Sequence, residues 1–496
     1  MKGGEPGLIA NSKGAPRCAP APGAARGSVL PAPASLTPAS LPSEPLAFAP
    51  PSGGSYATVP SASRPLGRRS ALFAGGVLVA LGAALTALPA ALAWPFLAAL
   101  LWLQAALKGV AALARPRCAA AGAPELTVWP HYTVLVPLFR EADGIDRLLR
   151  HLDALDYPRS KLEVVLICEP HDAPTRAALR RPLPEGFRVA VAPAQGPQTK
   201  PKALTAILPT TRGEIVTIYD AEDAPHPQQL KAAARAFAAD PRLVALQAPL
   251  EVDNAHPAWV SRQFALEYAA LFHVWLPWLC RLGLPVPLGG TSNHVRRDAL
   301  DAVGGWDAFN VTEDADLAFR LALEPGARFG WLGYPTMEEA VAGFRAWCPQ
   351  RTRWLKGFMQ TWLGHATCGT GWRQGGWRRA VSLHVTVGLT LLSTLLHGLL
   401  LPVIVAASVA GFASSPALIT AGGLLYASGL AGLAVGARRA RIRLSLRDAV
   451  LAPLYWLMLT VPAWLAVREL VLRPHHWNKT AHNVAERRDA APWAAG

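Results

Sequence analysis

Three carboxylates stand together in one short stretch, and their spacing could support metal-ion chemistry. Asp220, Glu222 and Asp223 directly follow residues 215 to 219, an apolar run of mostly β-prone side chains. Such a run predicts a buried strand that ends in an acidic loop. Crowded carboxylates repel one another unless a cation joins them, and a hard divalent cation that carries a diphosphate fits such oxygen ligands. A solvated acidic turn is the alternative that this stretch leaves open.

The segments around the acidic loop alternate between strand-like and helix-like patterns. Strand-like segments occupy residues 133–139, 162–168, 187–192 and 214–219, and residues 144 to 155 have apolar side chains at helical spacing. This succession predicts an α/β fold with a parallel sheet and helices on both faces. In an open sheet of this kind, ligands bind at the carboxyl ends of the strands, where the acidic loop is expected.

Other charged residues are expected near the same edge of the sheet. Glu169 and Asp172 follow the second predicted strand, and Lys200 and Lys202 lie two residues apart. In an extended stretch the two lysines would share one face. Two structural alternatives stay open: Asp172 could cap the N-terminus of a helix, and the lysines could belong to a solvated basic turn.

Composition indicates a chain that associates with a membrane. Of the 496 residues, 51% are hydrophobic and only 16% are charged. The formal net charge of +15 suits anionic lipid or a phosphorylated substrate. The sequence has no zinc finger, aromatic-basic RNA motif or basic recognition helix, so nucleic acid is not expected as a partner. The six cysteines are scattered without CxxC spacing, which favours reduced thiols over a zinc site or a disulfide framework.

The first part of the chain is expected to contain a disordered tail and two membrane helices. Residues 1–69 are rich in Ala, Pro, Gly and Ser and have too few large apolar residues to fold. Residues 70–107 contain no Asp, Glu, Lys or Arg and exceed one membrane span of about 20 residues. Basic flanks on both sides predict two helices within residues 70–114, with both flanks in the cytoplasm. A secretory signal peptide is the competing interpretation, which the long basic lead-in disfavours.

A second apolar region follows the α/β segments, which span residues 125–370. Residues 371–380 mix tryptophan and arginine, which suits either a segment at the lipid headgroups or a surface linker. Residues 381–468 are predicted to form two to four transmembrane segments, and the tail of residues 469–496 is basic. The prediction is a multi-pass protein of the inner, cytoplasmic membrane, with the α/β domain in the cytoplasm.

Several motifs join the acidic loop in an order that resembles a known family. They are QTKPKAL at 198–204, GGTSNH at 289–294, VGGWD at 303–307, TED at 312–314 and QRTRW at 350–354. With them, residues 130 to 485 resemble a membrane-embedded family 2 glycosyltransferase of the cellulose synthase, hyaluronan synthase and curdlan synthase kind. The resemblance implies a GT-A type, Rossmann-like α/β catalytic domain combined with an α-helical transmembrane region.

The resemblance assigns one group of residues to a UDP-sugar donor and its metal ion. An Asp after the second strand binds the uridine in the family, the lysine-rich segment lies near the nucleotide or its phosphates, and the QxxRW arginine contacts the diphosphate. The acidic loop matches the family's DxD motif and implies Mg²⁺ or Mn²⁺, although Glu222 stands where a second Asp is usual. The donor-binding residues so implied are Glu169, Asp172, Lys200, Lys202, Asp220 and Arg353, and the metal ligands are Asp220, Glu222 and Asp223.

The later motifs are assigned to catalysis and to the acceptor. Asp314, with Glu313 beside it, would be the general base that removes the proton of the acceptor hydroxyl for a direct, inverting attack. Trp306 would form a stacking floor for a sugar, Trp354 would stack on the acceptor sugar, and Gln350 would orient these groups. Glu313 could instead be a helix-start acid that stabilises the N-terminal dipole.

These motifs favour an inverting, metal-dependent glycosyltransferase that extends a β-linked glycan from a UDP-sugar. The QxxRW motif favours processivity, in which case the membrane helices would form an export channel for the product. Two alternatives stay open: the addition of a single sugar to a lipid acceptor at the bilayer, and a transporter or sensor that binds nucleotide sugars without turnover. The sequence does not indicate whether accessory subunits take part.

Overall fold

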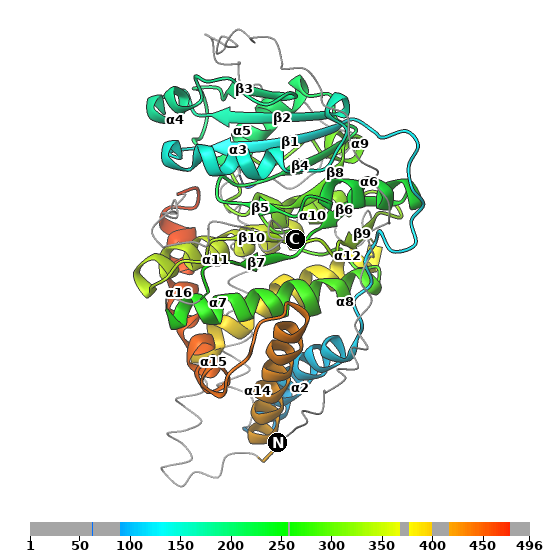
Figure 1. Ribbon diagram of the computed structural model, residues 1–496. Coiled ribbons are helices and arrows are strands. Elements are labelled where there is room, and N and C mark those ends of the chain that lie inside the picture. Colours follow the sequence, from blue (N-terminus) through cyan, green and yellow to red (C-terminus); the bar gives the residue numbers. More distant parts are fainter. Residues whose placement is uncertain (1–61, 63–89, 256–257, 368–375, 399–415, 477–496) are drawn as a thin grey trace, which may run out of the picture. The chain divides into compact units, whose positions relative to one another are not determined.

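A computed structural model describes residues 62, 90–255, 258–367, 376–398 and 416–476 (Figure 1). An α/β core extends from the first strand, which begins at Tyr132, to the last strand, which ends at Glu338. The predicted disordered tail, apart from Ala62, and the first predicted membrane helix lie outside the described residues.

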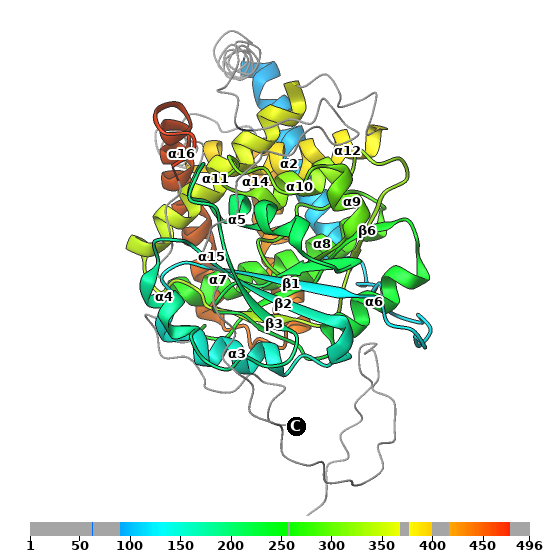
Figure 2. The same cartoon turned by 90° about the horizontal axis from the view of Figure 1, so that it is seen from above.

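The core is built on a seven-stranded sheet with the order β3-β2-β1-β4-β8-β6-β9. Its strands are β1 (Tyr132–Leu138), β2 (Leu162–Cys168), β3 (Phe187–Val191), β4 (Ile215–Ile218), β6 (Leu243–Gln247), β8 (Asn293–Arg296) and β9 (Arg328–Trp331). β1, β2 and β3 lie side by side and run parallel (Figure 2), and β1 also pairs in parallel with β4. The four predicted strands are thus confirmed, each within one residue of its predicted bounds.

The sheet is mixed, whereas the sequence predicted a parallel one. β8 runs antiparallel to both of its neighbours, β4 and β6, while β9 is parallel to β6. The chain leaves the sheet at the carboxyl end of β6, passes through α7 (Trp259–Ala270) and α8 (Leu276–Arg281), and returns next to β6. A strand that starts again from the edge where its neighbour ended must run in the opposite direction.

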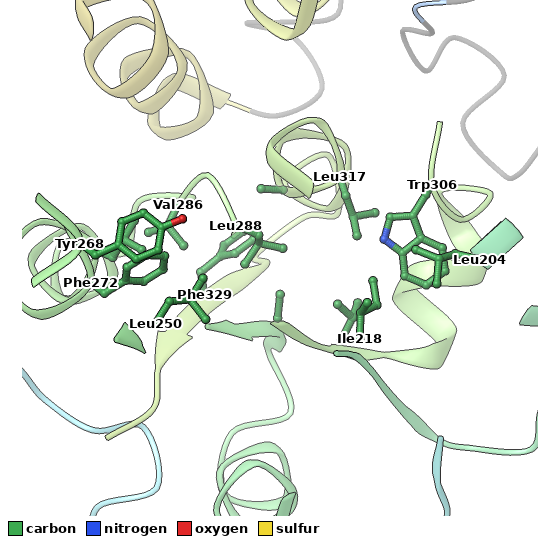
Figure 3. Packing of buried hydrophobic residues seen from close by; sticks show 14 of the residues in the cluster. Leu204, Ile218, Leu250, Tyr268, Phe272, Val286, Leu288, Trp306, Leu317 and Phe329 are labelled. Atoms are coloured by element: carbon green, nitrogen blue, oxygen red, sulfur yellow. The ribbon is translucent and has the colours of Figure 1, made fainter. Parts of the chain in front are cut away.

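Helices cover both faces of the sheet, as predicted. They include α3 (Ile145–Asp153), α4 (Ala173–Ala178), α5 (Lys200–Ile207), α6 (Gln229–Ala239), α9 (Arg297–Ala302) and α10 (Glu313–Leu321). Because successive side chains of a strand point to opposite faces, β1 contributes Leu135 to one buried cluster and Val134 and Val136 to another. The first cluster contains Leu204 of α5 and Leu317 of α10 (Figure 3), and the second contains apolar residues of α3 and α6.

A small second sheet adjoins the acidic loop. It has the order β5-β10-β7, with β5 (Ala224–Pro225), β7 (Leu250–Val252) and β10 (Thr336–Glu338). β10 pairs antiparallel with β5, so that Met337 lies opposite Ala224. Since β5 begins immediately after Asp223, this pairing brings the end of β10 close to the acidic loop.

A further set of helices forms what we call the helical region, which packs against α7 and α10. They are α2 (Ala90–Leu113), α11 (Phe344–Thr367), α12 (Gly376–Ser382), α14 (Pro416–Arg439), α15 (Leu446–Met458) and α16 (Thr460–Leu472). α2 packs along α14, and α11 packs along α16. Two stretches of the described chain, Gly376–Gly398 and Leu446–Leu472, are long and apolar enough to cross a membrane. Half of the predicted headgroup segment, residues 371–375, lies outside the described residues, and residues 376–380 belong to α12.

Candidate active site

One cavity of about 760 Å³ lies at the carboxyl ends of the parallel strands. It brings together Asp220 of the acidic loop, Asp314 of α10 and Arg353 of α11, which are far apart in the sequence. Glu169, which follows β2, and Lys200, which begins α5, line it as well. This convergence follows from the fold, since the carboxyl ends of parallel strands meet at the same edge of a sheet.

Asp220 is paired with Lys200 at the cavity wall. The Lys200 ammonium group lies 2.5 Å from a carboxylate oxygen of Asp220 and donates a second hydrogen bond, 2.7 Å long, to the carbonyl of Gly290. Thr199 caps α5 through its hydroxyl, which fixes Lys200 as the first residue of the helix. Burial opposes the charge of Lys200, but Asp220 and the acids at the start of α10 outweigh it and raise its pKa. Lys200 therefore contributes a fixed positive charge.

Asp223 is fully buried and holds the acidic loop together. One of its carboxylate oxygens accepts hydrogen bonds from the backbone N–H of Asp220, at 2.7 Å, and from the hydroxyl of Thr291. Burial first, and then the charges of Asp220 and Glu222, raise the pKa of Asp223 well above its usual range. Only Asp220 and Glu222 line the cavity. Asp223 lies behind its wall, where a loop-shaping role fits better than the predicted metal ligation.

Two acids of this loop suit a divalent cation that arrives with a diphosphate. The described residues contain no group of three His, Cys, Asp or Glu side chains arranged to hold a metal ion by themselves. Mg²⁺, however, commonly uses one or two carboxylates together with substrate phosphates and water. Asp220 already contacts one cation, the Lys200 ammonium group, while Glu222 lines the same cavity. The residues present therefore fit Mg²⁺ or Mn²⁺ bound together with a nucleotide.

The two predicted donor-site lysines have different surroundings. The segment 198–204 starts a helix instead of running extended, so the predicted shared face is wrong. Lys202 is fully buried: its ammonium group donates to the carbonyl of Pro193 at 2.8 Å and lies 3.5 Å from the carboxylate of Glu169. Glu169 lines the cavity and Lys202 does not. Lys202 therefore supports Glu169 from behind.

Asp172 is the N-cap of α4, as the structural alternative predicted. Its carboxylate accepts hydrogen bonds from the backbone N–H groups of Thr175, at 3.4 Å, and of Arg140, at 2.5 Å. Asp172 is buried and does not line the cavity, whereas Glu169 does. Of the two acids after β2, Glu169 is thus the one placed to meet a ligand.

Glu313 and Asp314 open helix α10, and both line the cavity. Burial raises the pKa of Asp314 to about 6, while backbone hydrogen bonds and the charge of Lys200 oppose the rise. Burial, followed by the charge of Asp314, raises the pKa of Glu313 to about 7. A Cβ atom at Gly290 would lie 3.6 Å from the Asp314 carboxylate, which is an ordinary van der Waals contact, so Gly290 lies directly beside that carboxylate. A partly shielded carboxylate of this kind suits proton abstraction.

Arg353 of α11 lines the same cavity as the acids and interacts with their charges. Burial lowers its pKa, whereas the nearby carboxylates of Glu313, Asp220, Asp314 and Glu222 oppose that shift. The positive charge of the guanidinium group is thus balanced by acids of the acidic loop and of α10. Its planar fork is suited to a diphosphate that lies between those acids.

Gln350 and Trp354 line the cavity beside Arg353, on the same helix. The side-chain oxygen of Gln350 is buried, and it has no hydrogen-bond partner among the residues that the structure describes. The Trp354 ring is stacked with that of Tyr268, with centroids 6.3 Å apart and an interplanar angle of 17°. An amide and an aromatic ring on one wall suit a sugar, which presents both hydroxyl groups and an apolar face.

Trp306 is buried in the core, so the predicted stacking floor for a sugar is wrong. Only 2% of its surface is exposed, and it packs in the same cluster as Leu204 and Ile218 (Figure 3). The hydroxyl of Thr205 donates to the Trp306 carbonyl at 2.9 Å and holds its backbone. A tryptophan side chain can pack in a hydrophobic core or stack on a sugar. Only the packing of α5 against the segment that contains Trp306 shows that this one belongs to the core.

Glu338 lines the cavity although no motif marked it. It ends β10, which the pairing with β5 holds beside the acidic loop. Burial first, and then the charges of Asp223 and Glu222, raise the pKa of Glu338 well above its usual range. Its Oε2 atom is buried and has no hydrogen-bond partner within the described ranges. No local sequence pattern marks Glu338 as a site residue, because only the pairing within the second sheet brings it to the cavity.

The cavity continues between helices of the helical region. Thr386, Thr390 and Thr394 line it at intervals of about one turn, and each hydroxyl donates to the carbonyl four residues earlier, at 2.6 to 2.7 Å. Each oxygen therefore remains able to accept a hydrogen bond. His397 and Tyr426, which are hydrogen-bonded to each other, also line this part. The helical part of the cavity thus has a polar wall.

Two family models match the chain. The model of glycosyl transferase family group 2 matches residues 215–465, which is more than half of the chain. The model of glycosyl transferase family 2 matches residues 133–290, from β1 through the acidic loop to Gly290. Together they cover every part of the cavity wall that the α/β core contributes.

Several known proteins are similar to part of the chain. A β-monoglucosyldiacylglycerol synthase of Trichormus variabilis is 31% identical over 245 residues, which are 48% of this chain and 50% of that protein. Cellulose synthase 2 of Novacetimonas hansenii is 27% identical over 263 residues, 50% of this chain and 16% of the synthase. The chain spans about half the length of the first of these relatives. Among solved structures, a mannosyltransferase from Pyrobaculum calidifontis in complex with GDP-Man and Mn²⁺ has a TM-score of 0.49 at 22% identity, covering 76% of this chain and 99% of that one.

Proposed function

Because the chain belongs to glycosyl transferase family group 2, we propose that it transfers the sugar of a UDP-sugar to an acceptor hydroxyl group, with inversion at the anomeric carbon. The chain is a glycosyltransferase, and its mixed α/β core is of the GT-A type. The proposal rests on one observation: a single cavity holds basic groups, an acidic loop and a partly shielded carboxylate, contributed by separate elements.

The donor is assigned to the side of the cavity at the strand ends. Lys200 and Arg353 would contact the diphosphate, and Glu169 would contact the nucleoside. Asp220 and Glu222 would hold Mg²⁺ or Mn²⁺, whose charge would stabilise the departing diphosphate. Lys200 and Arg353 belong to different helices and would contact the diphosphate oxygens from both. Their positive charges are already in place when negative charge develops on the leaving group, which stabilises the transition state.

Asp314 is assigned as the general base. It would accept the proton of the acceptor hydroxyl while that oxygen forms a bond to the anomeric carbon of the donor sugar. The bond between the anomeric carbon and the diphosphate oxygen breaks in the same step, and UDP leaves with its electron pair. Gln350 and Trp354 would bind the acceptor and hold its hydroxyl in line with the bond that breaks.

The acceptor would extend from Trp354 into the helical part of the cavity. The polar wall formed by Thr386, Thr390 and Thr394 favours a hydroxyl-rich glycan, because each threonine oxygen, whose O–H group is bonded to the backbone, can still accept a hydrogen bond from a sugar hydroxyl. We therefore place a growing β-linked glycan here first, with export between the membrane helices if the enzyme is processive. A lipid acceptor at the bilayer is the second candidate, which the similarity to a β-monoglucosyldiacylglycerol synthase supports. In both cases the catalytic domain would face the cytoplasm.

The assay for this proposal uses the full chain purified in detergent with radiolabelled UDP-glucose or UDP-N-acetylglucosamine and Mn²⁺. Cellotetraose and diacylglycerol serve as acceptors in parallel reactions. Transfer to the oligosaccharide with growth of long products supports the glycan acceptor, and a single addition to diacylglycerol supports the lipid acceptor. Binding of UDP-sugars without any transfer or hydrolysis would contradict the enzymatic proposal.

The transfer rate is expected to fall as the pH drops through about 6. Asp314 can accept a proton only when it is ionised, and its raised pKa of about 6 places its protonation in this range. The rate should fall about tenfold per pH unit below that value and level off above about pH 7. Initial rates of UDP release between pH 5 and pH 8 at constant ionic strength measure this profile. A flat profile between pH 5 and pH 7 would contradict the assignment of the base.

A further inference from the structure

We propose that Arg351 is a positioning residue that fixes the ring of Trp354, the aromatic side chain that the proposed function places against the acceptor; the inference rests on that function. Arg351 lies three residues before Trp354 and four residues after Trp347 on α11. Residues at these intervals lie on the same face of a helix. Arg351 is the central member of this row and meets both rings, with its guanidinium carbon 4.5 Å from the Trp354 centroid and 5.7 Å from that of Trp347.

The guanidinium group of Arg351 is clamped by Glu267 of α7. Its two terminal nitrogens donate to the two carboxylate oxygens of Glu267, at 3.1 Å and 2.6 Å. A two-point contact of this kind fixes the plane of the guanidinium group as well as its position. Arg351 is only 6% exposed, whereas the Glu267 side chain is partly exposed, so the guanidinium group is the buried member of the pair. The plane that faces Trp354 is therefore set by α7.

Tyr455 of α15 completes the clamp. Its hydroxyl accepts hydrogen bonds from Arg351 and from the indole N–H of Trp347, both at 3.0 Å, and donates to Glu267 at 2.9 Å. The donor and both acceptor positions of the phenol oxygen are thus in use. The clamp joins α7, α11 and α15. Of these, α15 lies in the stretch Leu446–Leu472, which is long and apolar enough to cross a membrane.

Trp354 is held by two aromatic neighbours in addition to the guanidinium group. It is stacked with Tyr268, and Phe264 lies with its ring centroid 6.0 Å from that of Trp354. The guanidinium carbon of Arg351 lies 4.6 Å from the Phe264 centroid, so the cation contacts both rings. Without the clamped guanidinium plane, the ring contacts of Trp354 with Tyr268 and Phe264 would remain. Stacking on a sugar requires a fixed ring orientation. Loss of the guanidinium plane should therefore weaken binding of the acceptor and leave binding of the donor unchanged.

The variant Arg351→Lys tests this directly, because lysine keeps the charge but has neither the fork nor the plane. The full chain is labelled with 5-fluorotryptophan, and the ¹⁹F resonance of Trp354 is assigned by its loss in Trp354→Phe. We expect this resonance to shift and broaden in Arg351→Lys. The control Arg296→Lys removes a guanidinium group that lies 5.1 Å from the Phe237 ring, away from the cavity, and should leave the resonance unchanged. An unchanged Trp354 resonance in Arg351→Lys would overturn the proposal, whether or not transfer is observed.

Steady-state kinetics separate positioning from a general structural defect. With UDP-glucose as donor and cellotetraose or diacylglycerol as acceptor, Arg351→Lys should raise the KM for the acceptor about tenfold and leave the KM for the donor within about twofold. Tyr455→Phe, which removes only the hydroxyl, should raise the acceptor KM about threefold. An equal rise in both KM values would instead indicate a merely structural role. Absence of transfer by the wild-type chain would contradict the proposed function, while the NMR result would still decide on the role of Arg351.

Discussion

Asp314→Asn is expected to lower the rate of sugar transfer by about 10³-fold and to leave the Kd for UDP within about twofold of the wild-type value. Asparagine has the size of aspartate but cannot accept the proton of the attacking hydroxyl. The proposed donor groups, Lys200, Asp220 and Arg353, remain in place in this variant. Initial rates of UDP release measure the first effect, and titration calorimetry with UDP and Mn²⁺ measures the second. Near-normal turnover by Asp314→Asn would exclude this residue as the base.

Glu313→Gln is the matched control, because Glu313 is the adjacent acid and lines the same cavity. Its loss should reduce the rate by no more than about tenfold if it only modulates the charge of Asp314. Asp298→Asn changes an exposed residue of α9 and should leave the transfer rate unchanged. A lower rate in this variant would indicate damage during purification. A larger loss in Glu313→Gln than in Asp314→Asn would reverse the assignment of the two acids.

Asp220→Asn is expected to weaken the metal-dependent binding of UDP by about 100-fold. Asp220 is one of only two acids of the loop that line the cavity, so its loss leaves Glu222 as the only loop carboxylate for the cation. In metal-free buffer the difference from wild type should shrink, because the substitution also removes a negative charge that repels the diphosphate. Calorimetric titrations with UDP, with and without Mn²⁺, measure both values. Equal affinities of the two proteins in Mn²⁺ would place the cation elsewhere.

Asp223→Asn provides the matched comparison within the same loop. The raised pKa of Asp223, caused by burial and by Asp220 and Glu222, means that a neutral side chain suits this position. Asparagine can still accept hydrogen bonds from Asp220 and Thr291 through its side-chain oxygen. The affinity for UDP and Mn²⁺ should therefore change by less than about threefold. A loss as large as that in Asp220→Asn would restore Asp223 as a metal ligand, as the sequence predicted.

Local sequence patterns were sufficient to predict much of the core. Alternating strand and helix patterns located β1 to β4, and a short apolar run that ends in acids placed Asp220 at the carboxyl end of a buried strand. The motifs that contain Asp314 and Arg353 meet this loop in one cavity, as predicted. In each case a few neighbouring residues are enough to predict both the chemical role of the side chain and the element on which it lies.

The unpredicted features all depend on contacts between distant segments. β8 is antiparallel because of the path that the chain takes through α7 and α8, and Glu338 reaches the site only through the pairing of β10 with β5. Trp306 and Lys202 are of residue types that occur at sugar and phosphate sites, yet both are buried by the packing around α5. Residue type and spacing do not distinguish a side chain that lines a cavity from one that supports its wall.

The most direct test is a crystal structure of the full chain with UDP and Mn²⁺, with an anomalous difference map recorded for manganese. We predict a manganese peak beside the carboxylates of Asp220 and Glu222, with the diphosphate within contact distance of Arg353 and Lys200. A manganese peak away from Asp220, or a nucleotide bound outside this cavity, would contradict the account.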